Sequence, residues 1–210
     1  MADNINLGAI FQTVTEQLSE KKEMLNEADK YNHDHGDHMV QIFNLVQNAV
    51  TKKSEEPVSK QLDYASKVVG KEAQSGSAKL YAEGLANAAK NFSGSELDQN
   101  TLGMLVKSLL NVEEQTQAEQ PKQNSGLLSS LLSGLTGSSD TDKSDSSIGI
   151  DEILRAGMAF YQSKQNGESN TDAIIGALMA ASPLGQSAHR SQSGGIVAST
   201  ILNFASSLNK

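Results

Sequence analysis

Apolar residues recur along this chain at intervals of three and four, which is the spacing of an amphipathic α-helix. We identify about eight such stripes, and they cover residues 10–18, 39–50, 58–69, 80–92, 102–109, 153–161, 174–179 and 197–208. No run alternates apolar and polar residues in the way that a half-buried β-strand does. The pattern therefore predicts an all-α fold, in which mostly short connections join antiparallel neighbouring helices.

Composition narrows the possible functions of the chain. It has 210 residues and a net charge of −8, and a negative chain is poorly suited to non-specific binding of nucleic acid or anionic membranes. It contains no cysteine, which excludes disulfides, thiolate zinc sites and cysteine nucleophiles. No apolar run approaches the roughly 18 residues of a membrane span, and the N-terminus lacks the pattern of a signal peptide. We therefore expect a cytoplasmic protein without a membrane partner.

One stretch differs from the rest in composition. Residues 113–149 are rich in Ser, Gly, Gln, Glu and Asp, and they interrupt an otherwise helical domain that we expect to span 1–210. Within this insertion, leucines at positions 127, 128, 131, 132 and 135 have helical spacing. The segment is either a flexible linker with one short amphipathic helix or a mobile lid or partner-docking element, because loops of this length are disordered or functional.

A polar segment at residues 29–39, DKYNHDHGDHM, concentrates groups that bind metals and phosphates. It contains three aspartates and three of the four histidines, namely Asp29, His33, Asp34, His35, Asp37 and His38. Asp37 is a candidate N-cap for the helix that carries Met39, and Gly36 permits a tight turn before it. A helix N-terminus favours anions, and carboxylates favour hard cations, so the segment fits a Mg²⁺–phosphate site.

Two other interpretations of this segment stay open on the residues alone. His33, His35 and His38 are suitable ligands for a transition metal, because imidazole suits such ions. Alternatively, the side chains serve only the turns of a solvated loop. A calcium EF-hand is excluded, since the acidic positions are out of phase and no glutamate closes the loop.

Two further segments carry polar residues into a helix. Residues 72–81, EAQSGSAKLY, place Ser75, Gly76 and Ser77 before a helix expected to start near Ala78. Residues 182–196, SPLGQSAHRSQSGGI, form an expected loop that enters the last helix through its Ser-Gly-Gly and contains His189 and Arg190. Each is an ordinary cap or loop when considered alone. Together with residues 29–39 they can meet at one end of a helical bundle and form a nucleotide pocket.

The three segments in this order resemble the L subunit of bacterial dihydroxyacetone kinase. LNEADKYNHDHGDHM is similar to its first motif, L-x-x-x-D-x-x-x-G-D-x-D-H-G-x-N-M, EAQSGSAKLY to its second, and SPLGQSAHRSQSGGI to its third. The resemblance implies a closed barrel of eight antiparallel helices. It also implies an ATP or ADP site at one mouth of the barrel, and phosphoryl transfer that requires a separate substrate-binding subunit as partner.

The resemblance implies that three aspartates hold two Mg²⁺ ions against the phosphates. Asp29 matches the first of them and Asp34 the last, which leaves Asn32 or His33 near the middle one. An alignment without a gap instead pairs Asp34 with the middle aspartate and puts Asp37 beside the last. Our candidate metal ligands are Asp29, Asp34 and Asp37. The candidate nucleotide-binding residues are His35, Gly36, His38, Met39, Ser75, Gly76, Ser77, Leu184, Gly185, Arg190, Ser193 and Gly195.

The third segment departs from the family motif. The family's Glu and Arg after Leu-Gly are Gln186 and Ser187 here, and its D-P-G-A is replaced by residues 193–196. These departures suggest that a phosphate contact has moved to Arg190. In this hypothesis helix N-termini at Asp37, Ser77 and Gly195 position the phosphates. The alternatives are a non-catalytic nucleotide-binding or interaction protein on the same scaffold, and a helical protein with a histidine-rich transition-metal site.

Overall fold

The computed structural model describes residues 6–92, 97–111 and 170–207, and these residues contain α-helices, one 3-10 helix and no β-strand. The predicted all-α fold is confirmed. The elements are α1 (Leu7–Glu20), α2 (Lys22–Ala28), α3 (His35–Lys52), α4 (Val58–Glu72), α5 (Gly76–Asn91), α6 (Gln99–Leu109), α9 (Asn170–Ala180), the 3-10 helix η1 (Pro183–Gln186) and α10 (Ala188–Ser207).

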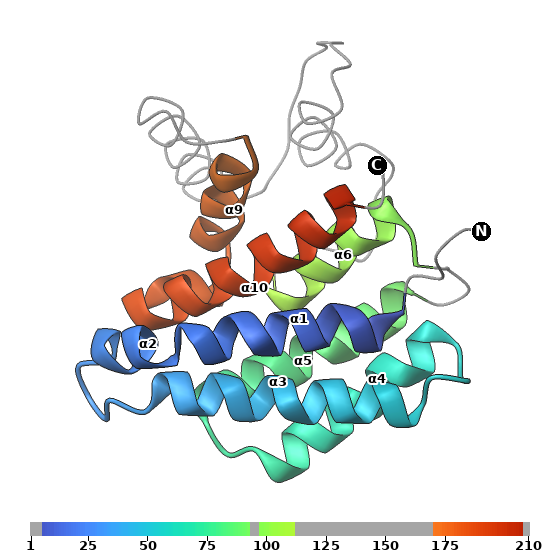
Figure 1. Cartoon of the computed structure of the whole chain (residues 1–210), viewed down its shortest axis with the longest axis horizontal. Helices are drawn as coiled ribbons and strands as arrows, with labels where there is room; N and C mark the ends of the chain where they lie inside the picture. The colour runs from blue at the N-terminus through green and yellow to red at the C-terminus, as the bar shows by residue number, and fades with distance from the viewer. Residues whose placement is uncertain (1–5, 93–96, 112–169, 208–210) are drawn as a thin grey trace, which may run out of the picture.

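The helices pack in a continuous series of neighbours. Helix α1 packs on α3, α3 on α4, α4 on α5, α5 on α6, α6 on α10, and α10 returns to α1 (Figure 1). Helix α9 packs on α10 and projects away from the other helices. The predicted closed barrel of eight helices stays a prediction, because residues 112–169 lie outside the described part of the chain.

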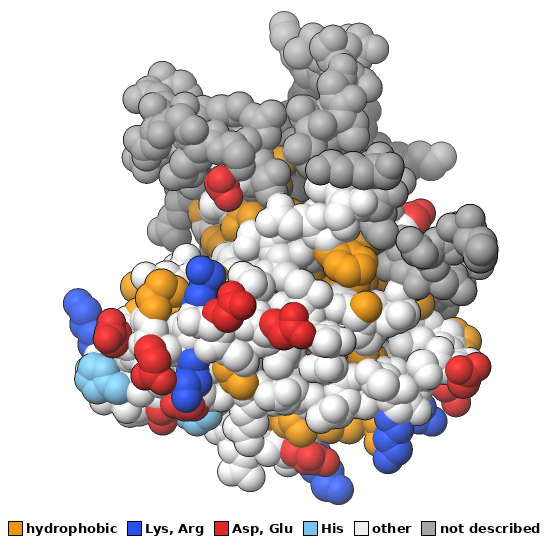
Figure 2. All heavy atoms as spheres, in the orientation of Figure 1, with side chains coloured by type: hydrophobic (Ala, Val, Ile, Leu, Met, Phe, Trp, Pro, Cys, Tyr) orange, Lys and Arg blue, Asp and Glu red, His pale blue; other side chains and the backbone are white. Residues whose placement is uncertain are grey.

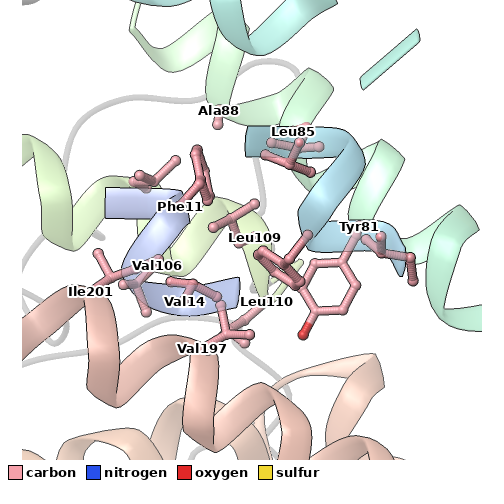
Figure 3. Close-up of a cluster of buried hydrophobic side chains, with 14 of the residues drawn as sticks. Phe11, Val14, Tyr81, Leu85, Ala88, Val106, Leu109, Leu110, Val197 and Ile201 are labelled. Carbon is pink, nitrogen blue, oxygen red and sulfur yellow. The ribbon is translucent and has the colours of Figure 1, made fainter. Parts of the chain in front are cut away.

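Buried apolar faces hold these helices together. Side chains from α1, α5, α6 and α10 meet in one cluster (Figure 3). Within the core the rings of Phe11 and Phe43 lie 6.1 Å apart, and those of Phe43 and Tyr81 lie 5.0 Å apart in an edge-to-face contact. Such burial supplies most of the stabilisation of a helical domain. Phe43 and Tyr81 therefore tie the middle of α3 to the first half of α5.

Helix α2 and the start of α3 differ from the sequence prediction. The pattern did not reveal α2, because this seven-residue helix buries only Leu25 and has no stripe to recognise. Helix α3 begins at His35 with Asp34 at its N-cap position, so the prediction of Asp37 as N-cap is wrong. Asp37 lies in the first turn, where its negative charge interacts favourably with the positive end of the helix dipole.

The last helix also starts earlier than predicted. Helix α10 begins at Ala188, so Ser193, Gly194 and Gly195 lie inside it and do not form its N-terminus. Glycine weakens an isolated helix, but packing overrides this preference here. A Cβ at Gly194 would lie 2.8 Å from Cε of Met179, so the glycine permits the close approach of α9. Helix α5 likewise begins at Gly76, ahead of the expected Ala78, with Ser75 as its N-cap.

Several predictions fall outside the described residues. These are the 113–149 insertion, its leucine-rich helix at 127–135, and the helix expected at 153–161. Among the helices that are described, none combines the length and the apolar character needed to cross a membrane. On the face drawn in Figure 2, acidic and basic side chains are mixed, and they group with histidine at the end where α2 meets α3.

Candidate functional site

The three polar segments meet at one end of the bundle. Helix α3 packs on α5 and on α10, so the starts of these helices approach one another. The loop between α2 and α3 and the first turns of α10 lie at the same end in Figure 1. Three contacts join the segments directly: His35 with Ser193, His35 with His189, and Gly76 with Arg190.

His35 is the central buried side chain of this junction. It is 4% exposed, and its Nε2 lies 2.9 Å from Oγ of Ser193, which is fully buried. The ring of His189 meets it edge to face, with ring centroids 4.6 Å apart. Burial lowers the pKa of His35 to about 4, with a further decrease from His189 and Arg190 and an opposing effect from Asp29. The imidazole is therefore neutral near pH 7, with one ring nitrogen able to donate and the other to accept.

Asp29 is the one buried carboxylate of the first segment. It follows the last residue of α2 and is 5% exposed, and its Oδ1 accepts a hydrogen bond from the backbone N–H of Tyr31 at 3.1 Å. Burial acts to raise its pKa, but the N–H of Tyr31 and the nearby His189 and His35 outweigh it, and the pKa is lowered. Asp29 is thus an ionised group that faces the two histidines.

Arg190 connects the third segment to the second. Its guanidinium lies against the first residue of α5, since a Cβ at Gly76 would be 2.7 Å from its Nη2. The Nε atom is buried without a hydrogen-bond partner, and no ion pair links Arg190 to a carboxylate of residues 6–92, 97–111 or 170–207. A cation held at the positive end of a helix, with no counter-charge of its own, favours an anion beside it.

The start of α10 adds further hydrogen-bond donors. Ser187 precedes the first residue of α10, the position where a serine usually caps a helix. Its Oγ is instead buried without a partner among the described residues. The first N–H groups of any α-helix have no carbonyl partner within the helix. These N–H groups lie within one helical turn of Arg190 and are available to a ligand, whereas the Ser187 Oγ has no exposed surface.

The start of α3, in contrast, is already satisfied by α2. Oδ1 of Asn26 accepts from the N–H of Gly36 at 2.7 Å and from the N–H of Asp37 at 3.3 Å. Nδ2 of Asn26 donates to Oδ2 of Asp37 at 2.8 Å, and Nζ of Lys22 lies 3.1 Å from Oδ1 of Asp37. Because Asn26 occupies these amides, Gly36 does not offer its N–H to a phosphate. Its role is close packing, since a Cβ here would be 2.1 Å from the carbonyl oxygen of Lys22.

The remaining side chains of residues 29–39 point to separate partners. Oδ1 of Asp34 lies 3.3 Å from Nδ1 of His38 at the surface. His33 has a positive φ of 56°, and its Nδ1 is 3.3 Å from the backbone oxygen of Asn26. In the described part of the chain, no three His, Asp or Glu side chains surround a common point suited to a metal ion. As arranged, Asp29, Asp34 and Asp37 do not fit a two-Mg²⁺ site, and the histidines do not fit a zinc site.

Other residues that were predicted to bind the nucleotide cap a helix or lie in the core instead. Ser75 caps α5 by accepting from the N–H of Ala78 at 3.0 Å, and Ser77 is buried. Met39 and Leu184 are core residues with no exposed surface.

A groove runs along the outer flank of α10. It has a volume of about 790 Å³ and lies between the α1–α2 junction, α9, η1 and α10. Gly185 and Gly195 line it, together with Met24, Met179 and Ile196. Ser191 and Gln192 line it as well, whereas Arg190 and Ser193 do not. This volume is within the range of about 300–1,000 Å³ that is common for small-molecule sites.

Sequence reasoning missed two important residues. Asn26 caps α3 from α2, a helix that the pattern did not predict. His189 packs on His35, and its position next to Arg190 in the third segment was the available signal. Comparisons of this chain with protein-family models, curated proteins and solved structures find no match.

Proposed function

We propose that this chain binds the phosphate groups of a nucleotide such as ATP or ADP where α3, α5 and α10 meet. One observation carries the proposal: Arg190 lies against Gly76 at the N-terminus of α5 without an ion-pair partner among the described residues. A guanidinium is suited to bidentate binding of phosphate oxygens. The N–H groups at the start of α10 supply further donors to the same anion.

The groove along the outer flank of α10 is a separate surface with a partly apolar lining. Its lining combines the apolar side chains of Met24, Ile175 and Met179 with three glycines. None of Arg190, Gly76 and Ser187 lines this groove, so the groove and the Arg190 junction lie on different sides of α10.

The buried pair of His35 and Ser193 supports this site from behind. The neutral imidazole fixes the Ser193 hydroxyl on the inner face of α10, one turn from Arg190. This contact holds the start of α10 against the start of α3, so the donors are oriented before a ligand arrives. We assign His35 a positioning role in the proposal and no proton transfer.

The resemblance to the dihydroxyacetone kinase L subunit extends the proposal to phosphoryl transfer with a separate substrate-binding partner. Mg²⁺ ions would neutralise phosphate charge in such a reaction. The three candidate carboxylates do not fit these ions as they are arranged, and Asp37 is bound to Lys22 and Asn26. This observation favours the second candidate, a nucleotide-binding protein on the same scaffold that does not catalyse transfer. For either function we propose a cytoplasmic location, with which a chain that contains no cysteine, and so no disulfide, is compatible.

Equilibrium binding and turnover separate these functions. Titration of the full chain with ADP and ATP should give saturable binding that is competed by pyrophosphate. If neither nucleotide binds, the proposed function is wrong. If ATP binds and no phosphate is released or transferred with any candidate substrate-binding subunit added, the non-catalytic function is the correct one.

A further inference from the structure

We propose that this site binds nucleotide phosphates without a divalent cation, with Arg190 as the fixed positive charge in place of the metal. The inference rests on the proposed nucleotide binding and concerns how the negative charge of the phosphates is balanced. Two sets of contacts support it: those that occupy the candidate carboxylates, and those that hold Arg190 at the junction.

Asp37 is occupied by the packing of α2 on α3. Both of its carboxylate oxygens have partners, Lys22 at 3.1 Å and Asn26 at 2.8 Å. The same Asn26 side chain caps the N–H groups of Gly36 and Asp37. Turning Asp37 toward a metal would break its ion pair and disturb this cap. The hydrogen bond from Asn26 and the interaction with Lys22 lower the pKa of Asp37, as expected for a carboxylate held by donors.

Asp29 and Asp34 are directed to different partners. Asp29 is buried against the N–H of Tyr31 and faces His35 and His189. Asp34 lies at the surface, beside the ring of His38. Metal sites for Mg²⁺ need oxygen ligands in near-octahedral positions about one point. These carboxylates have separate surroundings, and gathering them would require the loop between α2 and α3 to refold.

Arg190 already provides positive charge where a phosphate would lie. Its guanidinium lies between the first turn of α10, which carries it, and Gly76 at the start of α5. The two helix N-termini add partial positive charge of the same sign. A divalent ion next to this guanidinium would be repelled, whereas a phosphate would be attracted. The chain's own groups therefore supply the charge balance that a metal provides elsewhere.

The test measures the affinity of the full chain for ADP and for pyrophosphate, in excess EDTA and in Mg²⁺. The affinity of the wild type in EDTA should lie within about threefold of that in Mg²⁺. Arg190→Gln should lower it about tenfold or more in both conditions, because a charge-assisted, bidentate contact is lost. Lys60→Gln is the matched control, since it removes one exposed positive charge at the start of α4, away from the junction. It should bind like the wild type.

Three outcomes would overturn the inference. The first is binding that requires Mg²⁺ and is lost in Asp29→Asn or Asp34→Asn, which would leave the nucleotide proposal intact. The second is unchanged affinity in Arg190→Gln while the variant remains folded by circular dichroism. The third is absence of binding by the wild type in both conditions, which would overturn the nucleotide proposal as well.

Discussion

At the level of single residues, the buried histidine His35 makes the stability of the fold depend on pH. Its folded-state pKa of about 4 is below the ordinary value of 6.5, so the unfolded chain takes up the proton more readily. The stabilisation from neutral His35 is therefore complete above about pH 6.5 and is lost as the pH falls toward 4. Asp29 opposes this shift, whereas His189, Arg190 and His38 reinforce it.

We predict that the free energy of unfolding decreases by up to about 3 kcal/mol between pH 7 and pH 4 through this group. Urea denaturation at a series of pH values measures it. His35→Gln retains a polar side chain without this titration, so its stability should depend less on pH over the same interval. Equal pH dependence in the variant and the wild type would show that the burial of His35 does not carry the effect.

Gly76 is the residue that allows Arg190 to lie on the start of α5. In Gly76→Ala, the new Cβ would meet Nη2 of Arg190 at 2.7 Å, and the flexible arginine would move aside. We predict a loss of ADP affinity of about fivefold or more, with a melting temperature close to that of the wild type. Calorimetric titration and a thermal melt on the same sample measure both. Wild-type affinity in this variant would mean that the observed position of Arg190 does not matter for binding.

At the scale of helices, the contact between α2 and α3 depends on the absence of a side chain at Gly36. In Gly36→Ala the Cβ would be 2.1 Å from the carbonyl oxygen of Lys22, and a backbone atom cannot move without shifting a helix. We predict destabilisation by about 3 kcal/mol or more, measured by urea denaturation.

The matched variant is Gly70→Ala in α4, where the new Cβ would lie 3.7 Å from Cβ of Ala82, an ordinary contact. This exposed position should become more stable by about 0.5–1 kcal/mol, because alanine favours a helix over glycine. If the Gly36 and Gly70 variants had the same stability, close packing of α2 on α3 would not explain Gly36.

The helical spacing of apolar residues was sufficient to predict the long helices. It did not predict features that depend on tertiary contacts, such as the short helix α2 and the start of α10. Helix α2 is too short to display a stripe, yet it provides Lys22 and Asn26, which hold Asp37. The start of α10 was predicted too late because Ser193 and Gly194 are typical of a turn. In the structure both lie inside the helix, where Ser193 contacts His35 and Gly194 lets Met179 pack closely. Sequence spacing does not reveal such contacts between distant segments.

At the scale of the whole molecule, the three segments could be predicted to share a site, but their roles could not. The order of the polar segments indicated one end of a helical bundle, and the contacts of His35 with Ser193 and of Arg190 with Gly76 join them there. The carboxylates attracted attention in the sequence because metals favour them. Their actual partners depend on helices that come together only in the fold, where Lys22 and Asn26 hold Asp37.

If Arg190 and the helix starts around it bind the phosphates of a nucleotide, removing the guanidinium should weaken nucleotide binding. Calorimetric titration of ADP into the full chain, compared with the folded Arg190→Gln variant, tests it most directly. We predict saturable binding by the wild type, with a Kd on the order of micromolar, and a loss of about tenfold or more in the variant. Absence of ADP binding by the wild type, or equal affinity in the two proteins, would contradict the account.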